Sequence, residues 1–151
     1  SELAVGYCTL YGDMNGGLSL IGDLYKTNVF KLANWIDSTQ SIQSRKKYNL
    51  PSIGSIIGNK ILTKPPSAEL GPNQLDTDSL PPYTQLDAIL KGIIDNKQDS
   101  VQLQKEGFDK ELITKIISLI KNSEFKRKQA PPIIKLSNQS LGNDWRLPIA
   151  K

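Results

Sequence analysis

The sequence contains no histidine and only one cysteine, Cys8, in 151 residues. The absence of histidine excludes a histidine general base, a Ser-His-Asp triad and histidine-ligated zinc within this chain. A single cysteine excludes an internal disulfide and indicates a reducing, cytoplasmic setting. No apolar run reaches the roughly 18 residues that a membrane span requires, so we expect no membrane partner.

The chain also has neither a strong net charge nor an unusual amino-acid composition. Its formal net charge is +4, and 38% of its residues are hydrophobic. These values fit one globular domain or a piece of one, and they exclude a largely disordered chain. The sequence opens on Ser1 and enters structured-looking sequence within two residues, so we expect further sequence upstream.

Periodic apolar residues predict four helices, and these carry most of the expected core. The clearest pattern has Leu86, Ile89, Leu90, Ile93 and Ile94 on one stripe. A last helix is expected to begin after Asp109, which is a favourable N-cap residue, and to turn its isoleucines inward. The predicted helices cover residues 26–37, 83–96, 99–106 and 110–122.

The remaining segments are irregular in pattern. Residues 2–10 fit either a strand or a short buried helix, and residues 133–151 read as an irregular tail anchored by Trp145. Residues 38–60 are polar and basic, which predicts a solvated, variable connector; a phosphate-facing patch is the alternative. Residues 63–82 hold five prolines and predict a long loop of the kind that often serves as a lid.

The residues alone leave several functions open. Two predicted helices around Gly107 have the outline of a helix-turn-helix, although plain packing produces the same pattern. Cys8 lies among apolar residues and reads as an inert thiol. Asp76, Asp78 and Glu69 could bind a hard cation, but their spacing is not that of a calcium-binding loop, and exposed loop acids are the ordinary interpretation. The basic run at 125–128 follows a helix end, where cations complement the helix dipole.

Three longer strings are more specific. SELAVGYCTLYGDMNGGLSLIGDLYKT at 1–27 closely resembles a segment of NAD synthetases, and LTKPPSAELGPNQLDTDSLPPYTQLDAIL at 62–90 resembles the active-site lid of that family. EFKRKQAPP at 124–132 is similar to its basic C-terminal motif. The residues at 62–90 and 124–132 resemble the glutamine-dependent subgroup of the family more closely than the ammonia-dependent one.

The resemblance implies a mainly α fragment of a Rossmann-like α/β domain, of the adenine nucleotide alpha hydrolase-like ATP-pyrophosphatase type, with long irregular loops. No string of the Ser-Gly-Gly-x-Asp-Ser type occurs in residues 1–151. The chain therefore resembles the C-terminal part of the synthetase domain, without the pyrophosphate loop. We expect this fragment alone to be inactive.

The implied activity is ATP-dependent amidation of deamido-NAD to NAD through an acyl-adenylate, with ATP and Mg²⁺ as cofactors. The resemblance implies that Glu2, Tyr7 and Lys126 bind deamido-NAD and that Glu2 also binds the metal. It implies ATP contacts for Lys26 and Ser67. No residue is assigned as a catalytic acid, base or nucleophile.

The resemblance also implies partners outside the chain. Ammonia is expected from an upstream nitrilase-like glutaminase domain, and the full-length enzyme is expected to be a homo-oligomer with no nucleic-acid partner. Leu10 and Gly17 stand where ammonia-dependent members have a lysine and an aspartate, which fits the glutamine-dependent subgroup. Two alternatives remain: a catalytically inactive helical interaction module, and a nucleic-acid-binding helix-turn-helix.

Overall fold

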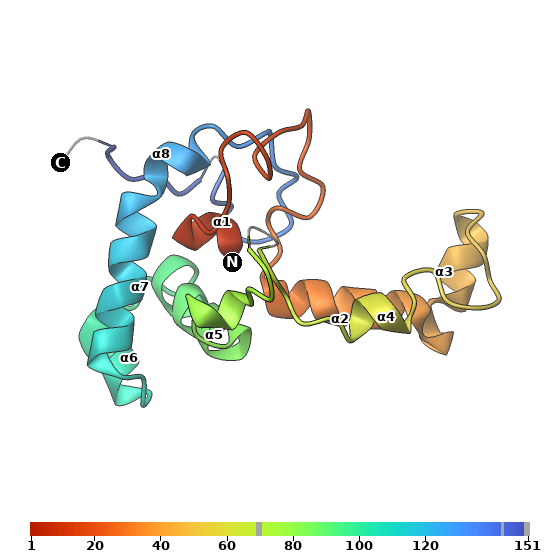
Figure 1. Ribbon diagram of the computed structural model, residues 1–151, viewed down its shortest axis with the longest axis horizontal. Coiled ribbons are helices and arrows are strands. Elements are labelled where there is room, and N and C mark those ends of the chain that lie inside the picture. The colour runs from red at the N-terminus through yellow and green to blue at the C-terminus, as the bar shows by residue number, and fades with distance from the viewer. Residues whose placement is uncertain (69–70, 143, 150–151) are drawn as a thin grey trace. The chain divides into compact units, whose positions relative to one another are not determined.

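The computed structural model describes residues 1–68, 71–142 and 144–149. Within these ranges the chain is helical and contains no β-strand, apart from an isolated parallel bridge between Ser19 and Ile133 (Figure 1). The expectation of a mainly α chain is therefore confirmed for these ranges. The chain forms two compact units: unit 1 is Ser1–Lys26 with Leu80–Lys151, and unit 2 is Thr27–Ser79.

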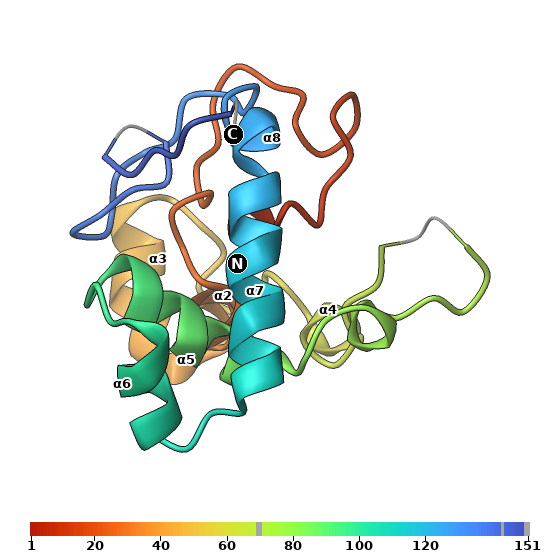
Figure 2. The same cartoon turned by 90° about the vertical axis from the view of Figure 1, so that its left-hand side faces the viewer.

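Unit 1 is built on the long helix α7, with the other helices around it. Figure 2 shows α5 and α6 beside α7, and α8 at the end of α7. Residues 2–10 form a short helix and a loop, so the strand alternative was wrong. The helices of this unit are α1 (Glu2–Val5), α5 (Tyr83–Ile94), α6 (Ser100–Lys105), α7 (Lys110–Asn122) and α8 (Glu124–Arg127).

The core of unit 1 is apolar and follows the predicted stripes. Residues from α1, α5, α6 and α7, together with Leu80 before α5, form one buried cluster, and Trp145 of the tail packs against it, as predicted. Ile93, Leu112 and Ile117 lie at its edge and are only partly buried. The cluster consists of Ala4, Val5, Leu80, Tyr83, Leu86, Ile89, Leu90, Ile94, Leu103, Ile113, Ile116 and Ile120.

Local capping explains where α6 and α7 begin. The carboxylate of Asp109 accepts a hydrogen bond from the Leu112 amide at 2.9 Å, which satisfies a donor in the first turn of α7. Asp99 does the same for the Gln102 amide at 2.8 Å. Gly107 has φ +96 in the turn between the two helices, a backbone conformation that favours glycine. The helix predicted over 99–106 is observed one residue shorter at each end, as Ser100–Lys105, and the helix predicted over 110–122 is confirmed with the same bounds.

Unit 2 contains short helices joined by loops. The expected helix over 26–37 is present with the predicted bounds, but no residue of it is buried, and Leu32 and Trp35 are exposed. The predicted burial of its apolar face was therefore wrong within the described residues. The elements are α2 (Lys26–Asp37), η1 (Thr39–Ser41), α3 (Ile42–Lys47), α4 (Asn59–Leu62) and η2 (Asp76–Asp78).

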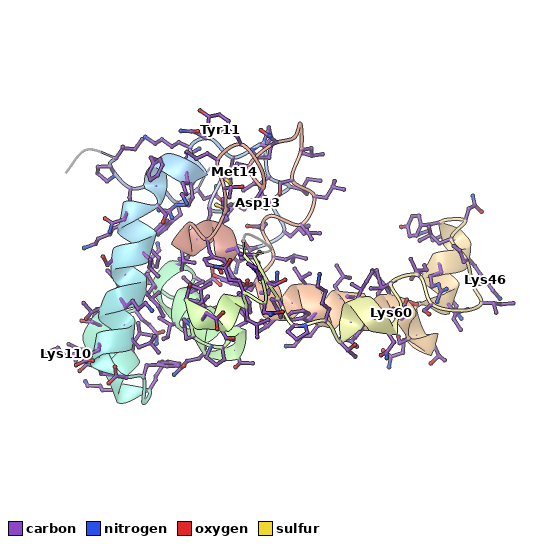
Figure 3. All side chains as sticks on the ribbon, in the orientation of Figure 1. Tyr11, Asp13, Met14, Lys46, Lys60 and Lys110 are labelled. Atoms are coloured by element: carbon purple, nitrogen blue, oxygen red, sulfur yellow. The ribbon has the colours of Figure 1, made fainter. Side chains whose placement is uncertain are left out.

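Polar contacts organise unit 2. Arg45 is 4% exposed, and its guanidinium donates to the carbonyl oxygens of Pro51 and Gly54. For Arg45 the prediction of a solvated side chain was wrong, because backbone carbonyls of its own unit surround it. By contrast, Lys46 on α3 and Lys60 on α4 are exposed, as expected for a basic surface (Figure 3).

The tail and the loop after α1 are tied together within unit 1. The Ser19 amide donates to the Pro132 carbonyl at 2.8 Å, and Asp23 accepts hydrogen bonds from the amides of Leu136 and Ser137. Figure 3 shows Tyr11, Asp13 and Met14 gathered in the loop after α1, away from Lys110 at the start of α7.

None of the helices in the described ranges has the length and apolar character that crossing a membrane requires.

Candidate functional site

Two of the predicted site residues form an ion pair in unit 1. Glu2 lies in the first turn of α1, and Lys26 is the first residue of α2. The Lys26 Nζ lies 2.7 Å from the Glu2 Oε1. The two side chains are 24% and 39% exposed, respectively, so solvent reaches both and weakens the pair. The pair thus places one anion and one cation where a ligand can reach them.

Tyr83 and Ser1 fix the orientation of this pair. The Tyr83 hydroxyl, at the start of α5, donates to Glu2 Oε1 at 3.2 Å, and Lys26 Nζ lies 5.5 Å from the centroid of the Tyr83 ring. The hydroxyl of Ser1 accepts a hydrogen bond from the Lys26 amide at 2.7 Å and itself bonds to Asp87. Two residues of unit 1, Lys26 and Tyr83, therefore both contact the Glu2 carboxylate.

Tyr7 lies just after α1 and is partly buried against the core of unit 1. Its amide donates to the Glu2 carbonyl at 2.9 Å, which ties its position to α1. Its hydroxyl oxygen is buried and has no hydrogen-bond partner among the described residues. A buried tyrosine hydroxyl usually has a hydrogen-bond partner, so the Tyr7 hydroxyl is available to bond to a ligand or another group beyond the described residues.

Lys126 reaches the same region from α8. Its Nζ donates to the carbonyl oxygens of Gly6 and Cys8, at 2.7 Å and 2.8 Å. An ammonium group has three protons, and these two contacts use two of them. The neighbouring thiol of Cys8 is partly buried, and this burial raises its pKa, which agrees with an inert role.

The structure thus gathers four of the predicted residues around α1, in unit 1: Glu2, Tyr7, Lys26 and Lys126. Ser67 lies in unit 2, where it is partly buried in the 63–82 loop. That loop has local order of its own: the Asp76 amide donates to the Pro66 carbonyl at 3.1 Å. Residues 69–70 of the loop lie outside the described residues.

Three residues of this region were not predicted to take part in it: Arg127, Glu124 and Tyr83. Arg127 and Glu124 form a completely buried ion pair, with side chains 0% and 1% exposed and 2.9 Å between Nη2 and Oε2. The spacing of an acid and an arginine three residues apart was the available signal, but a basic run usually indicates a surface. Tyr83 was predicted only as the start of a helix.

Metal-binding capacity in this region is limited. Within residues 1–68, 71–142 and 144–149, no group of three or more His, Cys, Asp or Glu side chains is arranged to hold a metal ion. Glu2 offers one carboxylate. Mg²⁺ is commonly bound by one or two carboxylates together with substrate phosphates, so a single carboxylate fits a nucleotide-bound Mg²⁺ and not a dedicated protein cage.

Known proteins match this chain over most of its length. The family model for NAD synthase matches residues 1–130. The glutamine-dependent NAD(+) synthetase of Synechocystis sp. is 49% identical over 151 residues, which are 100% of this chain and 25% of that protein. The enzyme of the same name from Thermotoga maritima is 41% identical over 149 residues, covering 99% of this chain and 24% of that protein.

A solved structure of the same description also matches. It is the glutamine-dependent NAD+ synthetase of Acinetobacter baumannii in complex with ADP, with 34% identity, coverage of 98% of this chain and 23% of that chain, and a TM-score of 0.46. The present chain thus spans about a quarter of the length of the relatives that it matches. On the match to the family model and the identity to these relatives, the chain belongs to the NAD synthase family.

Proposed function

We propose that this chain is the C-terminal part of the synthetase domain of a glutamine-dependent NAD synthetase. The observation that carries the proposal is family membership over residues 1–130, together with 49% identity to a relative of that name. The whole domain is then a Rossmann-like α/β domain of the ATP-pyrophosphatase type. Its pyrophosphate loop and parallel sheet are supplied by sequence outside residues 1–151.

The reaction proposed for the full-length protein has two steps. The nicotinate carboxylate of deamido-NAD attacks the α-phosphorus of ATP, and pyrophosphate leaves. Ammonia then attacks the acyl carbon of the adenylate, loses a proton and expels AMP, which leaves the amide of NAD. Both steps crowd negative charge, so cations near the phosphates stabilise the transition states.

Lys26 and Glu2 are proposed to bind the groups that carry this negative charge, one through its own positive charge and the other through a metal ion. Lys26 binds ATP phosphates, and Glu2 binds deamido-NAD and a Mg²⁺ ion that accompanies the nucleotide. In the structure the Lys26 Nζ and the Glu2 Oε1 lie 2.7 Å apart, so the two charges neutralise one another. An arriving phosphate competes for the ammonium and releases the carboxylate. When bound, Mg²⁺ supplies charge neutralisation to the phosphates.

Tyr7 and Lys126 are proposed to contact deamido-NAD. Tyr7 offers an aromatic face beside α1, and its hydroxyl has no partner among the described residues. The third ammonium proton of Lys126 can bond to an anionic or carbonyl oxygen. Ser67 is proposed to contact ATP from the 63–82 lid, which would exclude water from an adenylate that water hydrolyses. Residues 38–60 then form a variable connector.

The wider setting follows from the same assignment. Ammonia is proposed to come from an upstream nitrilase-like glutaminase domain, and the full-length enzyme is proposed to be a cytoplasmic homo-oligomer. Neither alternative function is favoured: an inactive interaction module has no supporting observation, and α6 and α7 bury Leu103, Ile113 and Ile116 as an ordinary packed pair would.

The test uses the full-length protein with ATP, Mg²⁺ and deamido-NAD, and with ammonium chloride as the ammonia source so that glutaminase activity is not needed. Lys26→Ala and Lys126→Ala each remove a charge-assisted contact worth about 1.5–3 kcal/mol, so NAD formation should fall roughly ten- to hundredfold. The control is Lys121→Ala, at an exposed position of α7, which should retain the full rate.

Wild-type rates for both site variants, at saturating and at limiting substrate, would contradict the assignment. The isolated chain, residues 1–151, should form no NAD in the same assay, because it contains no pyrophosphate loop. NAD formation above a blank would contradict that expectation.

A further inference from the structure

The C-terminal end of α1 is bound by side chains from the region around α8. A helix leaves its last carbonyl oxygens without partners inside the helix. In α1 the carbonyl of Ala4 accepts a hydrogen bond from Nη1 of Arg127 at 2.6 Å. The carbonyl of Val5 accepts one from the hydroxyl of Ser123 at 2.9 Å. We call Ser123 and Arg127 the α1 clamp.

The approach of the clamp to α1 is very close. Gly6 ends α1 with φ +70, and a Cβ atom placed on it would lie 2.1 Å from the Ser123 Oγ and 2.6 Å from the Ser123 Cβ. No side chain fits at this position. The backbone at the end of α1 therefore lies directly against Ser123, and the two cannot move independently.

Arg127 is held firmly on its other sides. Its Nε and Nη2 donate to Glu124 Oε2 at 3.1 Å and 2.9 Å, and Nη2 also donates to the carbonyl of Ile120. The guanidinium carbon lies 5.7 Å from the centroid of the Trp145 ring. Burial lowers the pKa of Arg127, and its bond to Glu124 opposes this shift. A buried arginine with all its nitrogens bonded is a fixed anchor.

The clamp matters because of what α1 presents at its other end. A helix of four residues rises about 1.5 Å per residue, so its ends are separated by only a few ångströms. A single helical turn is not stable by itself, and its geometry depends on its contacts. Glu2 in the first turn is therefore placed by what holds Ala4 and Val5.

We propose that Arg127, together with Ser123, is a positioning residue for the synthetase reaction, acting through α1 to fix the Glu2 carboxylate in the place beside Lys26 where it is proposed to bind deamido-NAD and Mg²⁺. This inference rests on the proposed function, because it needs Glu2 to work in the reaction. Within the basic C-terminal motif, Lys126 is then proposed to contact substrate with the ammonium proton not used by Gly6 and Cys8, whereas Arg127 acts only through its bonds within the protein.

The test is a double-mutant cycle in the full-length protein. Arg127→Lys keeps the positive charge but cannot bond to Ala4, Ile120 and Glu124 together. Displacement of a substrate-binding group such as the Glu2 carboxylate can lower the rate by up to about a hundredfold. We therefore expect Arg127→Lys to lower the kcat for NAD formation roughly ten- to hundredfold, with a smaller change in the KM for ATP. Single-turnover assays with enzyme in excess make slow variants measurable.

The decisive comparison is the same substitution in a Glu2→Gln background. If Arg127 acts through Glu2, Arg127→Lys should lower the rate less than twofold there. A merely structural role would lower the amount of folded enzyme and reduce both backgrounds by the same factor. The matched control is Arg45→Lys, another buried arginine that donates to carbonyl oxygens, and its effect should be equal in both backgrounds.

If Arg127→Lys fails to fold, Ser123→Ala is a milder substitution that tests the same proposal. Its effect on the rate of NAD formation should also be smaller in the Glu2→Gln background. Equal effects of both clamp variants in the two backgrounds, with Glu2→Gln itself slow, would overturn the positioning role and leave the proposed function intact. A wild-type rate for Glu2→Gln would overturn the role of Glu2, and the positioning inference with it.

Discussion

The two units of this chain are stabilised by different kinds of side chain. Unit 1 buries a contiguous cluster of aliphatic residues and a tyrosine, which outnumber its buried polar residues such as the Arg127–Glu124 pair. Among the described residues of unit 2, the buried ones are Ser41, Arg45 and Asp76, and all of them are polar. Apolar burial is insensitive to pH and tolerates small shifts, whereas hydrogen bonds to a charged group require one geometry and one ionisation state. Substitutions should therefore separate the units clearly.

The largest effect is expected from removing apolar volume in unit 1. Ile116→Ala deletes a side chain that is completely buried between helices, which costs about 2–5 kcal/mol. Ile61→Ala in unit 2 deletes the same atoms from a side chain that is 66% exposed, and it should change stability by less than about 0.5 kcal/mol.

Amide hydrogen exchange of the full-length protein can measure both substitutions, because it reports the stability of each region separately. The amides of α7 should lose protection in Ile116→Ala and keep it in Ile61→Ala. Similar losses in the two variants would mean that the apolar cluster does not dominate the stability of unit 1.

A smaller effect is expected from two glycines with positive φ. Gly6→Ala forces a left-handed residue, at about 1–2 kcal/mol, and also a collision with Ser123. Because the Ser123 Cβ is part of the collision, a rotation of the serine side chain cannot relieve it. Gly54→Ala in unit 2 has φ +74 and open space around the new methyl group, so only the backbone cost applies.

The shift in melting temperature of the full-length protein measures the difference. Gly6→Ala should lower it clearly more than Gly54→Ala does. A Gly6→Ala/Ser123→Gly double variant should recover part of the loss, because the colliding atoms are gone. Equal shifts for the two single variants would contradict the close packing of α1 against Ser123.

The helices of unit 1 could be predicted because periodic apolar residues and caps determine them locally. Asp109 caps α7, and the predicted stripe of α5 is buried except at Ile93, which is partly buried. The four unit 1 positions proposed as a site could be named only from the resemblance, since Glu2 or Lys26 alone looks like a surface charge.

The buried arginines could not be predicted in this way. One acceptor of the buried Arg127 is the Ala4 carbonyl of α1, more than a hundred residues away in sequence. The buried Arg45 likewise donates to backbone carbonyl oxygens, those of Pro51 and Gly54. A basic run in the sequence does not indicate which carbonyl oxygens will pack against it. The solvated interpretation therefore failed at Arg45, and the helix-dipole interpretation of the 125–128 run did not indicate that Arg127 is buried.

The smallest effect should come from the charge that organises the other end of α2. The Asp37 carboxylate accepts hydrogen bonds from the amides of Ile56, Ile57 and Gly58 at 2.7, 3.0 and 2.8 Å. These bonds, that of Ile57 first, lower the pKa of Asp37 below its ordinary value. A folded-state pKa below the unfolded one means that this stabilisation is fully present above about pH 4, the unfolded value. It is lost as pH falls through the lowered folded pKa.

Amide chemical shifts of Ile56, Ile57 and Gly58, followed by NMR from pH 6 to 3, measure this directly. They should titrate together with a midpoint below about 3.9, while the Ile116 amide in the apolar core stays unchanged. Asp37→Asn keeps one acceptor oxygen and should abolish the titration with little change in fold. The group is exposed, so the effect on global stability should be slight. A midpoint at or above 3.9 would mean that the carboxylate does not hold these three amides, and the contrast between an apolar unit and a charge-organised one would lose its clearest case.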